Sequence, residues 1–236
     1  MENLTILIPI YNEEDNLSRL YTELNAYIEI ASLPTNALLI NDGSTDKSKQ
    51  LIKEICKKNT QFKAIHLKKN YGLSAALKAG FDNVNTTYVA YMDADLQTSP
   101  FDFEKLLYYR NEFELVTGIR ANRKDSWIKK LSGKIANKIR RLFTKDGMED
   151  TGCPLKIIRT SYAKEIPMFR GLHRFLPAMI LLQNGKVKQI PVQHYPRLAG
   201  EAKFGLRNRL ISPFIDCFAY LWMKKKYIQY EIEEES

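Results

Sequence analysis

The sequence predicts a single α/β domain in which a mostly parallel sheet is flanked by helices. Its 236 residues are enough for one large domain with a full hydrophobic core. Short β-rich runs alternate with helix-forming segments, which is typical of βαβ units. Polar clusters follow three of the expected strands. This places them at the edge of a parallel sheet where ligands bind.

The expected strands and helices alternate along the first half of the chain. β-rich runs predict strands at residues 4–8, 37–40, 63–67, 87–92 and 114–117. Apolar spacing and helix start signals predict helices at residues 15–30, 44–57, 73–81 and 101–109. One helix therefore separates each strand from the next, which is the connection that parallel strands require.

The composition is that of a globular protein, with 44% hydrophobic and 27% charged residues. Its three cysteines, Cys56, Cys153 and Cys217, are far apart and odd in number. We therefore expect neither a disulfide framework nor a zinc site, and a reducing compartment fits best. The first residues lack a basic leader followed by a long apolar run, so we expect no secretory signal and a cytoplasmic location.

The net charge of +9 is concentrated in one segment. Between residues 127 and 145 there is no acid, and the basic residues there are Lys129, Lys130, Lys134, Lys138, Arg140, Arg141 and Lys145. These seven account for most of the net charge. The pattern indicates one local basic surface and argues against nucleic acid as a partner.

Three polar clusters stand where expected strands end. Residues 11–13 (Tyr-Asn-Glu) follow the first strand, Asn41 and Asp42 follow the second, and residues 93–97 (Asp-Ala-Asp-Leu-Gln) follow the fourth. Acids brought to one sheet edge would repel each other. A hard divalent cation, magnesium or manganese, is the simplest counterion, since it binds carboxylates together with substrate phosphates.

Each cluster also has a structural interpretation. Residues 41–44 have the composition of a turn and helix cap. Glu13 and Glu14 are acids of the kind favoured in a first helical turn. An Asp-x-Asp pair is common by chance. The specific signal is the set of three clusters, each at a strand end and in a consistent order.

Longer motifs make the chain resemble a known family. The matching segments are IPIYNEEDNL, NDGSTDKS, KKNYGLSAALKAGF, YMDADLQTSP, EDTGCPLK and HYPRLAGEAKFG, and they extend from about Ile8 to Gly205. The chain resembles the family 2 inverting glycosyltransferases, which have the Rossmann-like A-type fold. Within them it is similar to the polyprenyl-phosphate sugar transferases, the group of dolichol-phosphate mannosyltransferase.

The resemblance implies roles for matching positions. The nucleoside pocket would be lined by Pro9, Tyr11, Glu13 and Asp42. The metal that bridges the donor diphosphate would be held by Asp93, Asp95 and Gln97. The donor or acceptor phosphates would be contacted by Arg120, Arg197 and Lys203, the last two from a loop. Asn41 stands where many relatives have Asp, which leaves open whether the donor is GDP- or UDP-linked.

The implied reaction is metal-dependent, inverting transfer of a sugar from a nucleotide-sugar to a polyprenyl phosphate at the cytoplasmic membrane face. An acceptor phosphate is largely ionised near neutrality and needs positioning more than a strong base. If the acceptor is instead a sugar hydroxyl of a cell-surface glycan, a base is needed, and Asp150 is the best candidate. A non-catalytic nucleotide-sugar-binding protein is the third alternative.

Two segments suggest contact with a membrane surface. Residues 127–143 place apolar side chains on one helical stripe, opposite a basic face. Residues 210–223 would span about 21 Å as a helix, short of the roughly 30 Å hydrocarbon core, so we expect them to lie in the interface. We therefore divide the chain into a catalytic domain, 1–208, and an interfacial helix with an acidic tail, 209–236. Core packing of the first segment, or packing of the second on a partner subunit in a homo-oligomer, remains open.

Overall fold

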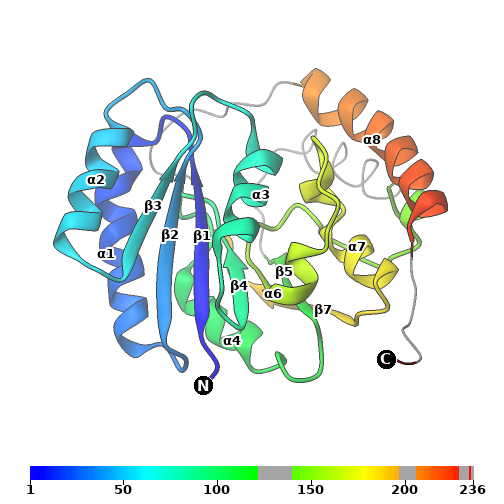
Figure 1. Ribbon diagram of the computed structural model, residues 1–236, viewed down its shortest axis with the longest axis horizontal. Coiled ribbons are helices and arrows are strands. Elements are labelled where there is room, and N and C mark those ends of the chain that lie inside the picture. The colour runs from blue at the N-terminus through cyan, green and yellow to red at the C-terminus, as the bar shows by residue number, and fades with distance from the viewer. Residues whose placement is uncertain (122–139, 197–205, 229–233, 235–236) are drawn as a thin grey trace.

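The computed structural model describes residues 1–121, 140–196, 206–228 and 234 (Figure 1). Its strands are β1 (Leu4–Ile10), β2 (Thr35–Asn41), β3 (Phe62–His66), β4 (Tyr88–Tyr91), β5 (Leu115–Arg120), β6 (Lys156–Arg159) and β7 (Val187–Val192). Its helices are α1 (Glu14–Ile30), α2 (Ser48–Lys58), α3 (Leu73–Asn83), α4 (Phe103–Leu107), α6 (Thr160–Lys164), α7 (Leu176–Leu182) and α8 (Leu206–Lys226). Residues 140–144 are also helical.

The strands form one seven-stranded sheet in the order β3-β2-β1-β4-β6-β5-β7. β1 pairs in parallel with β2 and β4, and β2 pairs in parallel with β3. β6 is antiparallel to both of its neighbours, β4 and β5, while β7 is parallel to β5. The expected α/β fold with a mostly parallel sheet is therefore confirmed, with β6 as the reversed strand among those described.

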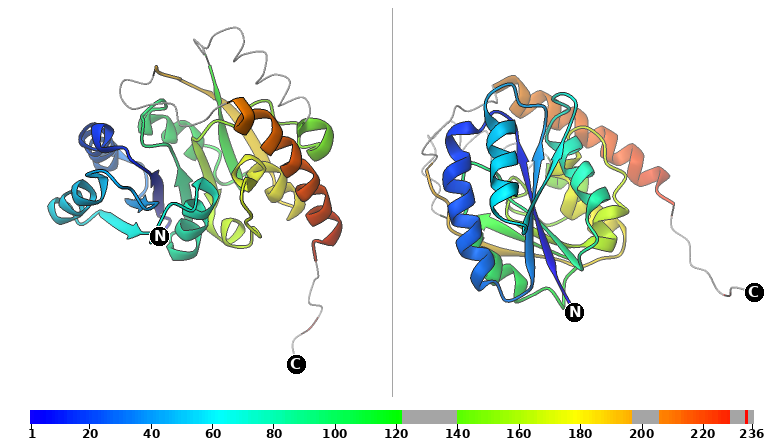
Figure 2. Two further views of the ribbon diagram at one scale, coloured as in Figure 1. Left: turned by 90° about the horizontal axis from the view of Figure 1, so that it is seen from above. Right: turned by 60° about the vertical axis from the view of Figure 1, so that its left-hand side comes forward.

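Helices cover both faces of this sheet (Figures 1 and 2). Apolar side chains of α1, α2 and α4 pack with one set of strand residues, including Ile6 and Ile8. Side chains of α3, α6, α7 and α8 pack with the alternate set, including Leu7. The period of two along β1 thus divides the core into two layers, because successive strand residues point to opposite faces.

The five strands expected from the sequence all occur, within a few residues of the expected bounds. The second helix differs, since it begins at Ser48 and not at Ser44. Residues 42–47 form a loop instead, and its polar side chains bond to the loop that follows β1. A local start signal was therefore overridden by contacts between two loops.

The expected domain boundary at residues 208/209 falls inside α8. The described part of α8 packs on the sheet domain: Cys217 and Tyr220 are buried in the core, and Tyr220 stacks on Phe175 with ring centroids 5.5 Å apart. Arg174 also forms an ion pair with Asp216, at 3.0 Å. The helix is thus docked on the sheet domain through one face.

Residues 127–139, which are most of the basic segment, lie outside the described residues. Arg140 departs from the expected basic face, because it is 5% exposed and its guanidinium is ion-paired with Asp146. The same guanidinium donates to the carbonyl oxygen of Met148 at 2.7 Å. Arg140 therefore stabilises the turn after this helix and does not add to a surface charge.

Candidate active site

The loops that follow β1 and β2 are bonded to each other. The amide of Asn12 donates to Ser44 Oγ at 3.0 Å, and the amide of Glu13 donates to Ser48 Oγ at 2.9 Å. In return, the amide of Thr45 donates to Asn12 Oδ1 at 2.8 Å. Asn12 has a positive φ of 51°, which lets its side chain reach across. Two polar clusters of the sequence are thereby joined at one sheet edge.

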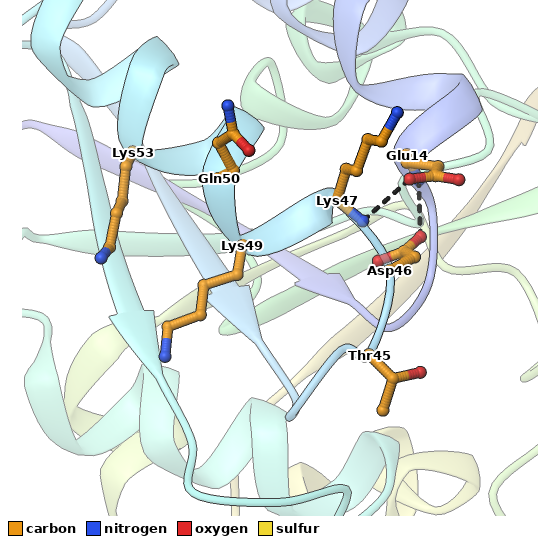
Figure 3. A pocket seen from close by; sticks show the side chains of 7 residues that line it. All are labelled: Glu14, Thr45, Asp46, Lys47, Lys49, Gln50 and Lys53. Atoms are coloured by element: carbon orange, nitrogen blue, oxygen red, sulfur yellow. Dashed lines mark hydrogen bonds between the residues drawn. The ribbon is translucent and has the colours of Figure 1, made fainter.

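The acids next to these loops cap backbone amides (Figure 3). The amide of Lys47 donates to Glu14 Oε2 at 2.8 Å, and the amide of Glu14 donates to Asp46 Oδ2 at 3.2 Å. Burial opposes ionisation of Asp46, but hydrogen bonds from Ser48 outweigh it and lower the pKa of that carboxyl. These contacts give the acids a structural role in shaping the loop.

Asp42 holds the loop that leads into α3. Its two carboxylate oxygens accept from the amides of Tyr71 and Gly72, each at 2.8 Å. A Cβ at Gly43 would lie 2.2 Å from the carbonyl carbon of Lys69, so only glycine permits this close approach. Asp42 is 4% exposed, which indicates that its side chain positions the backbone of the loop before α3, next to the expected nucleoside pocket.

Asn41, the departure from the family pattern, is turned inward. Its Oδ1 accepts from the amide of Ser44 at 3.0 Å, and its Nδ2 lies 3.2 Å from His66 Nδ1. With 1% of its surface exposed, it stabilises the turn after β2. The neighbouring positions expected to line the nucleoside pocket, Pro9, Tyr11 and Glu13, are half-buried at the end of β1 and the start of the next loop.

Asp93 and Asp95 lie in the tight turn after β4. Asp93 Oδ1 accepts from the hydroxyl of Tyr91 at 2.8 Å, and Asp95 Oδ1 accepts from the amide of Gln97 at 3.2 Å. Leu96 adopts a positive φ of 53°, a conformation that is unfavourable for a branched side chain and is found at functional turns. Burial, followed by repulsion from Asp95, raises the pKa of Asp93 to about 6.

Gln97 connects the acidic turn to the segment after β7. Its carbonyl oxygen accepts from the amide of Tyr195 at 2.9 Å and lies 3.1 Å from His194 Nδ1. Residue 196 is the last described before the expected phosphate loop. Arg197 and Lys203 of that loop lie outside the described residues.

Arg120 and Asp150 form the charged pair at the end of β5. Arg120 Nε and Nη2 donate to the two carboxylate oxygens of Asp150 at 2.8 and 2.9 Å. Burial opposes the guanidinium charge, but bonding and attraction from Asp150 outweigh it and raise the pKa of Arg120. Since Asp150 also accepts from the amide of Gly152 at 3.1 Å, this geometry favours a positioning role over that of a general base.

The acidic turn has the donor chemistry of a magnesium or manganese site. Asp93 and Asp95 could supply two hard oxygen ligands, and a divalent cation would offset the repulsion between them. Among the described residues, no group of three or more His, Cys, Asp or Glu side chains is arranged to hold a metal. The residues therefore fit a cation bound by two carboxylates, with Gln97, substrate phosphates or water at the other positions.

Sequence reasoning assigned no role to Lys156 or Tyr91, although both adjoin this site. They are register partners on β6 and β4, and Lys156 Nζ lies 5.8 Å from the Tyr91 ring centroid. Both side chains are buried. A lysine within a β-rich run gave no local signal of burial, because the period of two does not tell which face is covered.

Comparisons with known proteins agree on a family. Residues 5–166 match the model of glycosyl transferase family 2. Undecaprenyl-phosphate 4-deoxy-4-formamido-L-arabinose transferase of Edwardsiella ictaluri is 31% identical over 215 residues, which are 90% of this chain and 66% of that protein. The chain therefore spans about two thirds of the length of this relative.

Solved structures of glycosyltransferases share the fold. Glucosyl-3-phosphoglycerate synthase from Mycobacterium tuberculosis, in complex with Mn2+, UDP-glucose and phosphoglyceric acid, matches 97% of this chain and 81% of its own. The TM-score is 0.71 at 12% identity. A mannosyltransferase from Pyrobaculum calidifontis, in complex with GDP-mannose and Mn2+, matches 92% of this chain and 63% of its own, with a TM-score of 0.67 at 14% identity. At such identities the likeness concerns the fold.

Proposed function

Because the chain belongs to glycosyl transferase family 2, we propose that it transfers a sugar from a nucleotide-sugar donor to a polyprenyl phosphate, with inversion at the anomeric carbon. The observation that carries this proposal is the acidic turn after β4, in which Asp95 is buried and Asp93 accepts from the hydroxyl of Tyr91. It is supported by the 31% identity to the undecaprenyl-phosphate transferase. The donor is a GDP- or UDP-linked sugar.

The transfer is a single displacement. An oxygen of the acceptor phosphate forms a bond to the anomeric carbon, while the bond from that carbon to the donor diphosphate breaks and the diphosphate leaves with the electron pair. A bound magnesium or manganese ion would stabilise the charge that develops on the leaving diphosphate. No proton has to be removed from an ionised acceptor, which suits a site in which Asp150 is engaged by Arg120.

The residues of the chain are assigned to binding and orientation. Asp93, Asp95 and Gln97 would hold the metal, and Pro9, Tyr11, Glu13 and Asp42 would form the nucleoside side of the site. Arg120, fixed by Asp150, would present its charge to a phosphate. Arg197 and Lys203 would add positive charge from their loop. All of these groups would act by positioning the charged phosphates of the substrates. When a diphosphate is the leaving group, such positioning and electrostatic stabilisation supply most of the rate acceleration.

An exposed apolar surface on α8 supports a lipid acceptor. We call it the α8 apolar surface; its members are more than a third exposed and are Phe214, Ile215, Phe218, Leu221 and Trp222. Exposed Leu142 lies on the neighbouring helical residues 140–144, and Phe143 contacts Phe218 with ring centroids 5.3 Å apart. Such a contiguous exposed apolar patch is typical of a binding or membrane interface.

Basic residues border the α8 apolar surface. Lys145, Lys224 and Lys225 line a groove of about 690 Å³ together with Leu142, Phe143 and Leu221. No described helix is both long enough and apolar enough to cross a bilayer. Exposed apolar side chains with lysines beside them are typical of surfaces that bind the interface of an anionic membrane. We therefore propose that residues 209–236 hold the catalytic domain peripherally at the cytoplasmic membrane face.

A donor and acceptor screen tests the function. The purified chain is incubated with GDP- and UDP-linked sugars, polyprenyl phosphate or a soluble sugar acceptor, and manganese, magnesium or chelator. We expect a polyprenyl-phosphate sugar product that depends on the metal, and its near-complete loss in Asp93→Asn and Asp95→Asn. Faster transfer to a glycan hydroxyl would overturn the lipid acceptor. Donor binding without transfer or hydrolysis would indicate a nucleotide-sugar-binding protein, and full activity in chelator would refute the metal.

A further inference from the structure

Lys156 is a lysine placed in the interior of the sheet. It is 1% exposed and lies on β6, between β4 and β5. Lysine is rarely buried, because taking an ammonium group out of water costs free energy unless it is hydrogen-bonded. This burial lowers the pKa of Lys156. Because burying this lysine costs stability, we expect a function of its ammonium group among the groups that it contacts.

The ammonium group is bonded to the turn that leads into β6. Lys156 Nζ donates to the carbonyl oxygen of Thr151 at 3.3 Å and to that of Cys153. On its other side it faces the ring of Tyr91, 5.8 Å from the centroid. The side chain therefore ties residues 151–153 to the strand that carries the acidic turn.

Lys156 contacts two groups, the Tyr91 ring and the turn at residues 151–153, and each of them adjoins one part of the candidate active site. The hydroxyl of Tyr91 donates to Asp93 at 2.8 Å. Asp150, at the start of the tied turn, makes the two-point bond to Arg120. Lys156 also attracts Asp93 and Asp150 through their opposite charge. It thus lies between the acidic turn and the Arg120–Asp150 pair.

We propose that Lys156 is a positioning residue for sugar transfer, whose ammonium group fixes the turn at residues 151–153 and so holds the Arg120–Asp150 pair in register with Asp93. The inference rests on the proposed function of the site. An apolar side chain of similar length would fill the same space, but it would leave the turn carbonyls without their donor. Small losses of alignment at a reacting centre reduce turnover strongly, because the catalytic groups must be preorganised.

Three variants test the proposal by kinetics. Lys156→Met removes the donor and the charge, Lys156→Arg keeps both, and Lys164→Met is the matched control. Lys164 is exposed on α6, where its Nζ contacts Asn85 at 3.1 Å. We expect Lys156→Met to lower kcat at least about tenfold, with a smaller change in the donor KM. Lys156→Arg should recover most of this loss, and the control should match the wild type.

The reactivity of Cys153 gives a readout that needs neither donor nor metal. Its side chain is fully buried, and its carbonyl is held by Lys156. In Lys156→Met we expect the released turn to raise the rate of maleimide modification of Cys153 at least about tenfold. Buried Cys217 on α8 serves as the internal reference, because its rate should stay unchanged. Mass spectrometry of the two peptides distinguishes them.

Several results would overturn the inference. One is wild-type kcat or unaltered Cys153 protection in a folded Lys156→Met. Another is faster labelling of Cys217 together with Cys153, since this means general unfolding. If Lys156→Met does not fold, the kcat of Lys156→Arg is the deciding measurement. Loss of turnover in a folded Lys156→Arg would contradict a role for the cationic donor. A wild-type chain that transfers no sugar overturns the proposed function itself, whereas normal transfer by Lys156→Met overturns only the role of Lys156.

Discussion

The guanidinium of Arg120 meets the carboxylate of Asp150 in a two-point ion pair, with nitrogen–oxygen distances of 2.8 and 2.9 Å. The pair joins the end of β5 to the turn before β6, and its side chains are 18% and 9% exposed. A bidentate pair of this kind fixes orientation as well as charge. It gives Arg120 a defined direction at the edge of the acidic turn.

Removing one partner of this pair should destabilise the protein. Asp150→Asn leaves a largely buried guanidinium without its counterion, so we expect a loss of about 3 kcal/mol in the free energy of unfolding. Turnover should fall as well, because Arg120 loses its fixed direction. Urea unfolding measures the first effect and initial rates the second. The double variant Arg120→Met, Asp150→Leu should regain stability but not activity. Wild-type stability and rate in Asp150→Asn would contradict the assignment.

The raised pKa of Asp93 makes the stability of the metal-free protein depend on pH. The folded-state pKa is about 6, above the ordinary aspartate value of 3.8, so the folded state binds more protons than the unfolded state between these two pH values. The contribution of Asp93 to stability is full below about pH 4 and is lost as pH rises through about 6. Asp93→Asn should therefore raise the melting temperature by at least about 2 °C near pH 7.5.

The same variant should show a smaller gain at low pH, where Asp93 is protonated in both states. Calorimetry in chelator at the two pH values gives the comparison, and an equal gain at both would refute the shifted pKa. The affinity of the wild type for the divalent cation should also fall as pH drops through about 6, since a proton on Asp93 competes with the metal.

The α8 apolar surface should bind anionic vesicles. We expect Phe218→Ser with Trp222→Ser to weaken binding at every salt concentration. Lys224→Glu with Lys225→Glu should weaken it chiefly at low salt, since each lysine contributes about 1 kcal/mol near an anionic surface. Co-sedimentation measures both effects.

The matched control for the charge reversal is Lys49→Glu with Lys53→Glu on α2, at the other end of the molecule from α8 (Figures 1 and 3). This pair changes the net charge equally and should leave vesicle binding nearly intact. If the wild-type chain ignores vesicles and self-associates in light scattering through the same residues, the surface is a subunit interface instead.

Arg197 and Lys203 are expected to stabilise the departing diphosphate. Each alanine variant should lower turnover about tenfold or more, because losing a charge-assisted contact costs roughly 1.5–3 kcal/mol. The melting temperature should not change. Steady-state kinetics with saturating donor measures the effect, and wild-type rates in the double variant would show that the motif match is misleading.

The contacts between the loops at the sheet edge could not be predicted from local sequence patterns. The sequence predicted polar clusters after β1, β2 and β4, and the structure has them there because parallel strands share a carboxyl edge. It could not show that Ser44 and Ser48 accept amide protons from the loop after β1. Their composition fits a helix start equally well, and only the approach of the second loop decides between the two uses.

The α/β class, the alternation of strands and helices, and the acidic turn at Asp93 could be predicted from the sequence, because periodicity and turn residues are local properties of the chain. The position of β6, which runs in the reverse direction between β4 and β5, and the burial of Lys156 on it became apparent only from the folded chain. The same is true of the ion pair between Asp150 and Arg120. These features depend on contacts between residues that are far apart in the sequence. The pairing of distant strands and the burial that results cannot be recognised from the local sequence.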